Sequence, residues 1–401
     1  MLKKLGRLTI LVGLCVTVTT CWLIGAVADP QAVMLQLCRQ QQRVLELQAR
    51  VAQAQTAIAA QLKPETAPPL LSFVMPCYNR ATVLDDVISS IYNQNLTVPF
   101  EVVAIDDAST DNSFTILQSY AAKLPNFYAY RNATNQRAPA TRNIAIAYAR
   151  GKYICNADSD DVFEPNSIQP MLDAMITGNY DVAFFQELRF FNDRTLKATS
   201  ISASTPPQNI ITLENLLREN YISPCAGNRI FTKDSWLHAG GYLEDRGHDS
   251  WSFSFKLLAS GCKAYVHPKS GYLHRLWSNK TSMWWDDNVN KVNNISPLRV
   301  VCENPEFFTP ESFAKIANYK KAEPDLMSFI QQQLANGGIK LIPQQQLEPL
   351  LKAYYYENRQ EYQKAVKHYN LAVRNGLTHQ NALARAAWAN AQLKNANVMS
   401  K

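Results

Sequence analysis

The sequence predicts an α/β fold, with a mainly parallel sheet flanked by helices, on two observations. Between Leu70 and Gln186, short apolar runs of strand length alternate with segments of helical periodicity, the pattern of a parallel sheet with helices on both faces. Two of these runs end in acidic residues, and the carboxyl ends of parallel strands share one edge of a sheet. A membrane anchor with a helical stem is expected before this domain, and an all-α region after it.

Each element of the alternation is predicted from its own residues. The predicted strands are Leu70 to Met75, Phe100 to Ile105, Phe127 to Tyr130, Lys152 to Cys155 and Tyr180 to Phe185. The predicted helices are Thr82 to Asn93, Asn112 to Lys123 with Asp111 as its N-terminal cap, Ala140 to Arg150, and Asn166 to Ile176. Residues 200–305 are less regular and rich in tryptophan, which either core packing or stacking against sugar rings would explain.

A membrane anchor is expected at the N-terminus. Lys3, Lys4 and Arg7 precede the uncharged segment Leu8 to Ala28, which is long enough to span a bilayer. A signal peptide cleaved after Ala28 is the alternative, although the apolar run exceeds the usual length of one. The basic flank predicts a cytoplasmic tail and a single-pass membrane protein. Such a protein would face the Golgi lumen in a eukaryote or sit in the inner membrane of a bacterium.

Helical segments are expected on both sides of the α/β domain. Before it, apolar residues recur in steps of three and four, as in a weak coiled-coil seam through which a homo-oligomer would form; they are Leu37, Val44, Leu47, Val51, Ala54 and Ile58. After it, five residues match positions of one tetratricopeptide repeat (TPR): Ala353, Tyr356, Ala365, Tyr369 and Ala372. The expected boundaries are 1–7 tail, 8–28 anchor, 29–69 stem and Pro-rich linker, 70–305 α/β domain and 306–401 helical region.

Composition narrows the class of protein. The chain has 401 residues, of which 47% are hydrophobic and 18% charged, as expected for a folded protein with two or three domains. The net charge is +7, but the basic residues are spread along the chain, so no nucleic-acid partner is expected. The 8 cysteines show no C-x-x-C spacing, which argues against a zinc site.

Acidic residues mark the candidate site. Asp158, Asp160 and Asp161 directly follow a predicted strand, and Asp106 and Asp107 end another. Carboxylates this close repel one another unless a cation lies between them, and Mg²⁺ or Mn²⁺ take oxygen ligands that they share with phosphate. A solvated acidic turn would explain one such group. Two groups at one sheet edge favour a binding site.

Several motifs, in this order, carry a resemblance to a known family. They are Ser72 to Arg80, Val102 to Asp111, Arg142-Asn143 followed by Ala149 to Ile154, Asp158 to Asp161, Gly240 to Tyr242, and Gly247 to Asp249. From Leu70 to Ser282 the chain resembles a family 2 glycosyltransferase of the GT-A fold, which has a Rossmann-like, mainly parallel sheet. The resemblance implies metal-dependent transfer of a hexosyl or N-acetylhexosaminyl group, in a single displacement with inversion. It implies a nucleotide-sugar donor, UDP-linked by preference, and an acceptor hydroxyl on a glycan, lipid or protein.

The resemblance assigns roles to residues at the predicted site. For the donor, Pro76 and Tyr78 would line the base, Asp107 or with less support Asp106 would accept its ring N–H, and Asp158 would bind the ribose. Arg80 belongs to the same donor site, and Arg142 would pair with phosphate or with a carboxylate of the motif. Asp160 and Asp161 would hold Mn²⁺ or Mg²⁺, with His274 either assisting them or structural. Asp249 would be the general base, or only a helix cap.

The sequence departs from the family pattern at three places, and two other functions compete with this one. His248 stands where a Glu is usual, Arg137 replaces a Gly, and Leu273 to Trp277 match the family only loosely. A nucleotidyltransferase is one alternative, but the segment Pro76 to Arg80 lacks the glycines of a phosphate loop. A catalytically inactive membrane-tethered scaffold is the other, and the acids at the predicted site argue against it.

Overall fold

The computed structural model describes residues 45–54, 69–192, 198–202, 210–211, 229–244, 249–269, 271–277 and 361–377, together with short stretches between 345 and 393. The chain divides into two compact units. One contains both sheets, and the other contains α16 (Tyr362–Arg374). The five residues matched to a TPR lie within the described residues, as do Leu47, Val51 and Ala54 of the coiled-coil seam, whereas Leu37, Val44 and Ile58 lie outside them. Both arrangements stay predictions.

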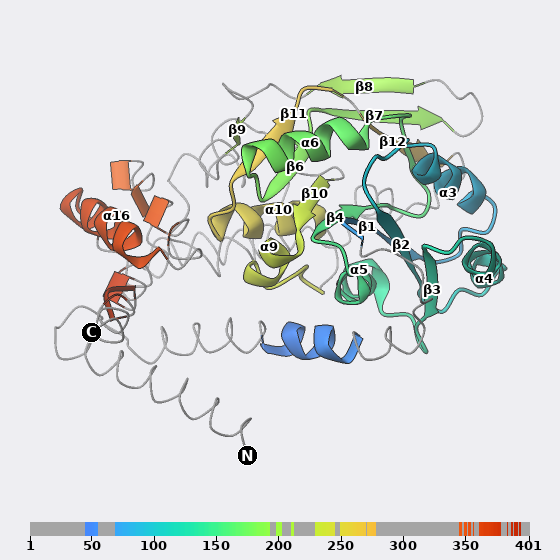
Figure 1. Cartoon of the computed structure of the whole chain (residues 1–401), viewed down its shortest axis with the longest axis horizontal. Coiled ribbons are helices and arrows are strands. Elements are labelled where there is room, and N and C mark those ends of the chain that lie inside the picture. The colour runs from blue at the N-terminus through green and yellow to red at the C-terminus, as the bar shows by residue number, and fades with distance from the viewer. Residues whose placement is uncertain are drawn as a thin grey trace, which may run out of the picture. The chain divides into compact units, whose positions relative to one another are not determined.

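An eight-stranded sheet forms the centre of the first unit, in the order β3-β2-β1-β4-β10-β6-β11-β9 (Figure 1). Strands β1 to β4 run parallel to one another, whereas β10 is antiparallel to both β4 and β6. The strands of this sheet are β1 (Leu71–Cys77), β2 (Phe100–Asp106), β3 (Phe127–Arg131), β4 (Tyr153–Asn156), β6 (Val182–Phe185), β9 (Ile210–Ile211), β10 (Arg229–Thr232) and β11 (Ala264–His267). The predicted α/β fold with a mainly parallel sheet is confirmed.

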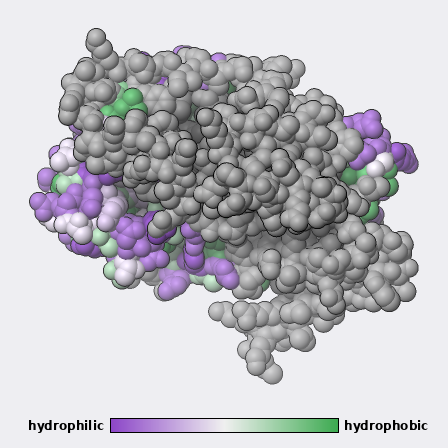
Figure 2. Space-filling view, turned by 180° about the vertical axis from the view of Figure 1, so that it is seen from behind, coloured by the Kyte–Doolittle hydropathy of each residue, from purple (hydrophilic) through white to green (hydrophobic). Residues whose placement is uncertain are grey.

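Helices cover both faces of the sheet, because its central strands carry apolar side chains on both faces. All residues of β1 are buried, as expected for a central parallel strand. The helices are α3 (Leu84–Tyr92), α4 (Ser113–Lys123), α5 (Arg137–Tyr148), α6 (Ile168–Gly178), α9 (Lys233–His238) and α10 (Asp249–Ala259). Helices α3 and α6 share the core cluster with Phe73 and Met75 of β1, and α5 packs on β1 and β2. From behind, the described surface beside this core is mostly hydrophilic (Figure 2).

A second, four-stranded sheet was not predicted from the sequence. Its order is β5-β12-β7-β8, and its strands are β5 (Val162–Phe163), β7 (Glu187–Asn192), β8 (Ala198–Ser202) and β12 (Tyr272–Leu276). Strand β12 pairs with β5, which lies directly after the acidic run that follows β4. The second sheet therefore brings His274 and its neighbours toward Asp158, Asp160 and Asp161.

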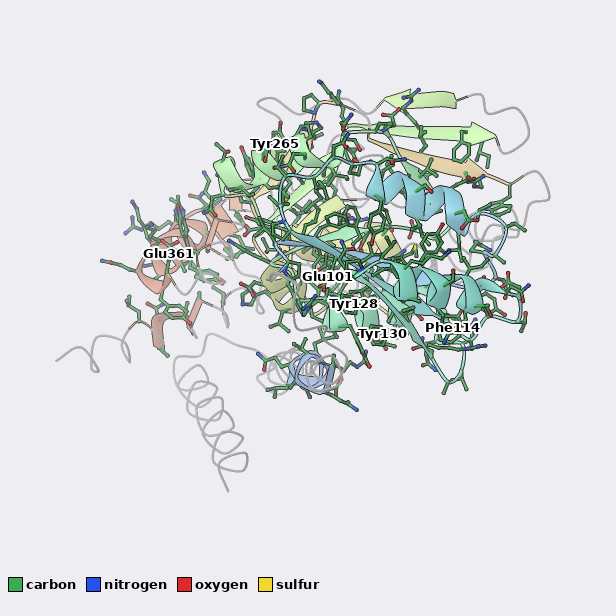
Figure 3. All side chains as sticks on the ribbon, turned by 45° about the vertical axis from the view of Figure 1, so that its right-hand side comes forward. Glu101, Phe114, Tyr128, Tyr130, Tyr265 and Glu361 are labelled. Carbon is green, nitrogen blue, oxygen red and sulfur yellow. The ribbon has the colours of Figure 1, made fainter. Side chains whose placement is uncertain are left out.

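A buried polar group fixes β4 against β1 and β2. The carboxylate of Glu101 accepts hydrogen bonds from Ser72 Oγ at 2.7 Å and from Arg150 Nε at 2.8 Å, and Arg150 stacks on Tyr128. Figure 3 shows Glu101 and Tyr128 on neighbouring strands. Next in the chain is Gly151, where an added Cβ would lie 2.6 Å from Ser72 Oγ. The close approach sets where β4 begins, and so where its acidic end lies.

The expected membrane location is corrected by the structure. No helix in the described ranges is both long and apolar enough to cross a bilayer, which contradicts the prediction of a single-pass membrane protein. The segment on which that prediction rested, residues 8–28, lies outside the described residues.

Candidate active site

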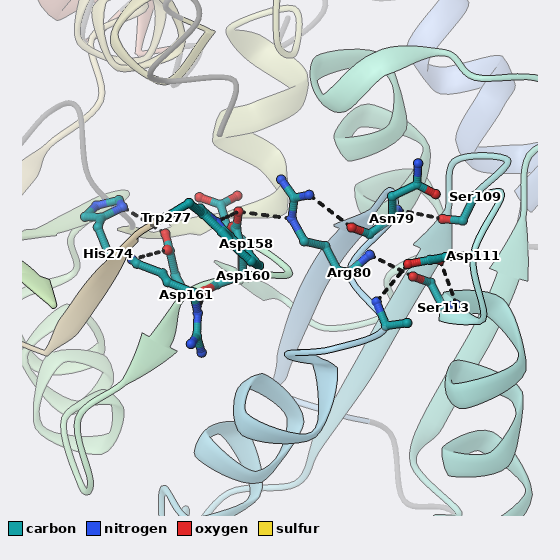
Figure 4. Close-up of polar contacts among 12 residues, drawn as sticks. Asn79, Arg80, Ser109, Asp111, Ser113, Asp158, Asp160, Asp161, His274 and Trp277 are labelled. Carbon is teal, nitrogen blue, oxygen red and sulfur yellow. Dashed lines mark hydrogen bonds and ion pairs between the residues drawn. The ribbon is translucent and has the colours of Figure 1, made fainter. Parts of the chain in front are cut away.

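The candidate site lies at the carboxyl edge of the parallel strands. Strands β1 and β2 end in register, with Cys77 opposite Asp106, and β4 runs on the other side of β1. The segments that follow the three strands therefore meet. Arg80, which follows β1, bonds to Asp160, which follows β4, with 3.1 Å between Nε and Oδ2 (Figure 4). The structure thus joins the predicted donor residue Arg80 to the predicted metal site.

Asp158 pairs with Arg142 of α5. The guanidinium also lies over the ring of Tyr242, 5.1 Å from its centroid. Burial acts to raise the pKa of Asp158, but the charges of Arg142 and then His274 outweigh it and hold the pKa below its usual value. Of the two partners considered for Arg142, phosphate or an acid of the motif, the structure shows the acid.

Among the acids after β4, Asp160 has a raised pKa. Its Oδ2 accepts from Arg80 and from Trp277 Nε1, the latter at 3.1 Å. Burial, followed by the nearby charge of Asp161, nevertheless raises its pKa to about 6. No described residue donates a hydrogen bond to Oδ1. An acid that is hard to ionise and keeps an unused oxygen is a natural ligand for a hard cation.

Asp161 is held by β12 through both oxygens. Oδ1 accepts from the backbone N–H of Arg275, and Oδ2 accepts from the Tyr272 hydroxyl, each at 2.8 Å. His274 Nδ1 lies 2.8 Å from Oδ2. Burial acts to lower the pKa of His274, but Asp161 overrides it, so that the pKa is raised above its usual value. The sequence-predicted metal residues Asp161 and His274 are therefore partners of each other.

A cation fits the donor set only in part. Asp160 has the oxygen chemistry and the unbalanced charge that a divalent ion would relieve. Among the described residues, however, no three His, Cys, Asp or Glu side chains are arranged to hold a metal ion together. In this arrangement Asp160 is the carboxylate that fits, whereas the oxygens of Asp161 are occupied by β12.

Asp106 and Asp107 are both buried, and they differ in how their oxygens are used. Asp107 accepts from the backbone N–H groups of Gln136 and Arg137, at 2.8 and 2.7 Å, and so anchors the start of α5. Asp106 Oδ2 pairs with Arg131 Nε at 3.2 Å. Its Oδ1 is buried without a hydrogen-bond partner among the described residues. The oxygen with spare capacity thus belongs to Asp106, not to the preferred Asp107.

The other predicted donor residues are split between core and surface. Pro76 lies within β1 and is buried, whereas Tyr78, directly after the strand, is 43% exposed. Asp249 is the first residue of α10, and its neighbour His248 lies outside the described residues. Tyr78 is therefore the member of the predicted base wall whose ring a ligand can reach.

Several residues of the site were not assigned roles from the sequence. Arg275 bonds the backbone oxygen of Asp160 through Nε at 2.8 Å, and Trp277 bonds its side chain. Asn143 accepts from Trp236 Nε1 and Tyr242 N, and donates to the carbonyl of Tyr242. The pairing of β12 with β5 and β7 brings Arg275 and Trp277 to the site, and no local pattern predicts that pairing. Asn143 belongs to the Arg142-Asn143 motif, but the partners of its side chain, Trp236 and Tyr242, are distant in the sequence.

Residues 72–236 match the sequence model of Glycosyl transferase family 2. The chain is 25% identical over 222 residues to the poly(ribitol-phosphate) beta-glucosyltransferase of Bacillus spizizenii, covering 50% of this chain and 35% of that protein. It is 26% identical over 224 residues to the chondroitin synthase of Pasteurella multocida, covering 48% and 23%. This chain therefore spans well under half the length of these relatives.

A solved structure is also similar. The S. aureus TarS 1-349 complex with UDP-GlcNAc has a TM-score of 0.48 and 19% identity, and the match covers 80% of this chain and 88% of that one. Residues 72–236 thus match a glycosyltransferase family, and the relatives that the chain resembles are named as glycosyltransferases. The enzyme class expected from the sequence is confirmed for this part of the chain.

Proposed function

We propose that the family 2 domain of this chain transfers a hexosyl or N-acetylhexosaminyl group from a UDP-linked donor to a hydroxyl of a glycan, lipid or protein. One observation carries the proposal. The acids after β4 meet Arg80 and Arg142 at the edge where β1, β2 and β4 end. Alternating acids and guanidinium groups can hold a cation and a diphosphate together. The class of sugar is supported by the names of two relatives, a beta-glucosyltransferase of Bacillus spizizenii and the beta-N-acetylglucosaminyltransferase TarS of Staphylococcus aureus. The UDP preference rests on the resemblance of the motifs.

In this proposal the acids have separate tasks. Asp160 would hold Mn²⁺ or Mg²⁺ through the oxygen that accepts no hydrogen bond from a described residue, and Asp161 with His274 would position the segment that carries it. When bound, the ion offsets the charge that develops on the leaving diphosphate. Arg142 fixes Asp158, which would face the ribose. Tyr78 would stack on the base, and Asp106 would accept its ring N–H through Oδ1.

The reaction is a single displacement. The acceptor hydroxyl would give its proton to Asp249 as its oxygen bonds to the anomeric carbon. The bond from that carbon to the diphosphate oxygen breaks in the same step, and the nucleoside diphosphate leaves with the bonding electrons, so the anomeric configuration inverts. General-base assistance of this kind is worth about 10²–10⁴-fold in rate. The position of Asp249 at the start of α10 also suits a helix cap. The transfer rate of a variant at this position would separate a general base from a cap.

A donor panel tests the proposal directly. The full chain is incubated with Mn²⁺ and a series of UDP-sugars, with and without simple glycosides as acceptors, and release of UDP is measured. We expect release from one or a few donors, lost when Mn²⁺ is chelated. If no donor in the panel is consumed under any condition, the inactive-scaffold alternative is favoured.

A further inference from the structure

Each of the three acids after β4 has a basic partner of its own, and Figure 4 shows the partners of Asp160 and Asp161. Asp158 pairs with Arg142, Asp160 with Arg80, and Asp161 with His274. The three basic groups come from three different elements: α5, the segment after β1, and β12. Each acid therefore has one basic partner, although burial and Asp161 still disfavour the charged form of Asp160. A divalent ion that bound Asp160 alone would have to share this carboxylate with the positive charge of Arg80.

Arg80 is the partner best placed to leave. Arg142 is embedded in α5, with its side chain 5% exposed, and Asp161 is fixed by β12 through both oxygens. Arg80 instead lies on the segment between β1 and α3, with its side chain 19% exposed. Its guanidinium stacks over the indole of Trp277, 5.3 Å from the ring centroid. The Arg80 side chain is therefore partly exposed to solvent while it contacts both Asp160 and Trp277.

The backbone of Arg80 is anchored, so that only its side chain needs to move. Its N–H donates to Ser113 Oγ at 2.8 Å, and the N–H of Ala81 donates to Asp111 at 3.1 Å. Asn79, with φ at 54°, donates its N–H to Ser109 Oγ at 3.0 Å. The segment after β1 is therefore tied to the segment after β2. From this fixed base a guanidinium can exchange a carboxylate for a phosphate, since it binds both in the same bidentate manner.

We propose that Arg80 is an internal counter-ion of Asp160, and that it moves to the donor diphosphate when a divalent cation takes its place. The inference rests on the proposed function, which supplies the cation and the diphosphate. A cation alone must displace a like charge, whereas a cation that arrives with a diphosphate gives Arg80 a new partner. Binding of the cation and of UDP should therefore be coupled, each strengthening the other by the same factor.

Direct titration of Mn²⁺ measures this coupling without turnover. Free Mn²⁺ is followed by electron paramagnetic resonance as it is titrated into the full chain, with and without UDP. The wild type should bind Mn²⁺ weakly alone and at least about tenfold more tightly with UDP, in the range usual for coupled sites. Arg80→Gln should bind Mn²⁺ alone about tenfold more tightly than the wild type, and UDP should then add little. Arg80→Lys, which keeps the charge, should resemble the wild type.

Controls separate this inference from the proposed metal site. Arg189→Gln removes an arginine whose partner is Glu164 of the neighbouring segment, and it should leave Mn²⁺ affinity unchanged. Asp160→Asn should abolish tight Mn²⁺ binding. If Arg80→Gln shows no cooperative thermal unfolding, Arg80→Met, which keeps an apolar stem over Trp277, replaces it. Unchanged or weaker Mn²⁺ binding by the neutral variants would overturn the counter-ion role of Arg80. Unaltered binding by Asp160→Asn would overturn the proposed metal site itself.

Discussion

At the scale of single residues, Asp106, which ends β2, and Asp107, which follows it, use their carboxylate oxygens differently. Asp107 uses both oxygens to hold the backbone of Gln136 and Arg137. Asp106 keeps Oδ1 without a hydrogen-bond partner among the described residues. The two adjacent carboxylates differ because Asp106 is the last residue of β2, whereas Asp107 follows the strand and reaches the start of α5.

The first prediction separates these two roles. Asp106→Asn should raise KM for the nucleotide sugar about tenfold, because a charged acceptor for the base is lost. The unfolding temperature should fall only modestly, because Asn keeps an oxygen for Ser109 N–H and the lost ion pair is with Arg131, whose side chain is 44% exposed. Asp107→Ala should lower the free energy of unfolding by roughly 1–3 kcal/mol, because two backbone donors lose their acceptor. Donor titrations and thermal unfolding of both variants measure the two effects. An Asp106→Asn variant with unchanged KM would remove the assigned base contact.

A second residue-scale prediction concerns Asn143, which joins α5 to Trp236 of α9 and to Tyr242. All three side chains are buried. Asn143→Ala would leave the indole N–H and a backbone N–H without acceptors, and should cost roughly 2–4 kcal/mol of stability. Urea denaturation checks the value. A loss below about 0.5 kcal/mol would mean that water replaces the amide.

The residue types of the site were predictable from the sequence, whereas their pairing was not. Three acids after one strand and two at the end of another indicate a shared edge, since the carboxyl ends of parallel strands lie at the same edge of a sheet. The hydrogen-bond partner of each carboxylate oxygen depends on residues that are distant in the sequence. The bond from Arg275 N to Asp161 spans 114 residues. No spacing rule reports a contact of that kind.

At the scale of elements, β1 to β4 follow from sequence because local composition decides them. Each contains an apolar run flanked by turn residues, and β1, β2 and β4 are buried along nearly their whole length, so they need no polar alternation. Helix α5 begins at Arg137, earlier than the predicted Ala140, because Asp107 satisfies backbone donors at its start. The second sheet was missed because β12 gains its strand character from pairing with β5 and β7.

The start of β4 provides an element-scale prediction. A Cβ at residue 151 would lie 2.6 Å from Ser72 Oγ and 2.8 Å from Ser72 N. Gly151→Ala should therefore destabilise the unit by roughly 1–3 kcal/mol, and it should lower kcat because the acids after β4 shift. Adding Ser72→Ala removes Oγ but leaves the backbone contact, so we expect only partial recovery. Full recovery in the double variant would show that the hydroxyl alone is in the way.

Helix α5 also offers a pH test. Lys233 Nζ donates to the carbonyls of Ala147 and Ala149 at its end, and burial lowers the lysine pKa to about 8. Between about pH 8 and 10.5 the unfolded chain binds more protons at this residue than the folded one. The contribution of Lys233 to stability should therefore rise with pH in that window, by at most about 1.4 kcal/mol per unit. Lys233→Met provides the reference, and parallel pH profiles for both proteins would contradict the prediction.

At the scale of the whole molecule, residues 46–54 of the N-terminal helix belong to the unit that contains both sheets. Arg50 bonds Glu244 at 2.6 Å, and the side chain of Leu47, which is 3% exposed, lies close to Gly241. The sequence assigned Leu47 to a coiled-coil seam between chains. In the structure the Leu47 side chain is buried against residues of its own chain. Truncating it should therefore affect folding and not oligomer formation.

Leu47→Ala distinguishes the two arrangements. If the contact is within the chain, the variant should lose roughly 2 kcal/mol or more of stability, and its sedimentation should not change. If Leu47 lies in a seam between chains, the main effect should be dissociation of an oligomer. Thermal unfolding and analytical ultracentrifugation of one variant therefore test both.

The account depends most on Asp160 as the acid that serves the donor diphosphate. The most direct measurement is the rate of sugar transfer by Asp160→Asn with saturating Mn²⁺, compared with Asp173→Asn, which changes an exposed acid of α6. We predict a loss of at least about 100-fold for Asp160→Asn and wild-type rates for Asp173→Asn, with both proteins folded. Transfer by Asp160→Asn at the wild-type rate would contradict the central claim.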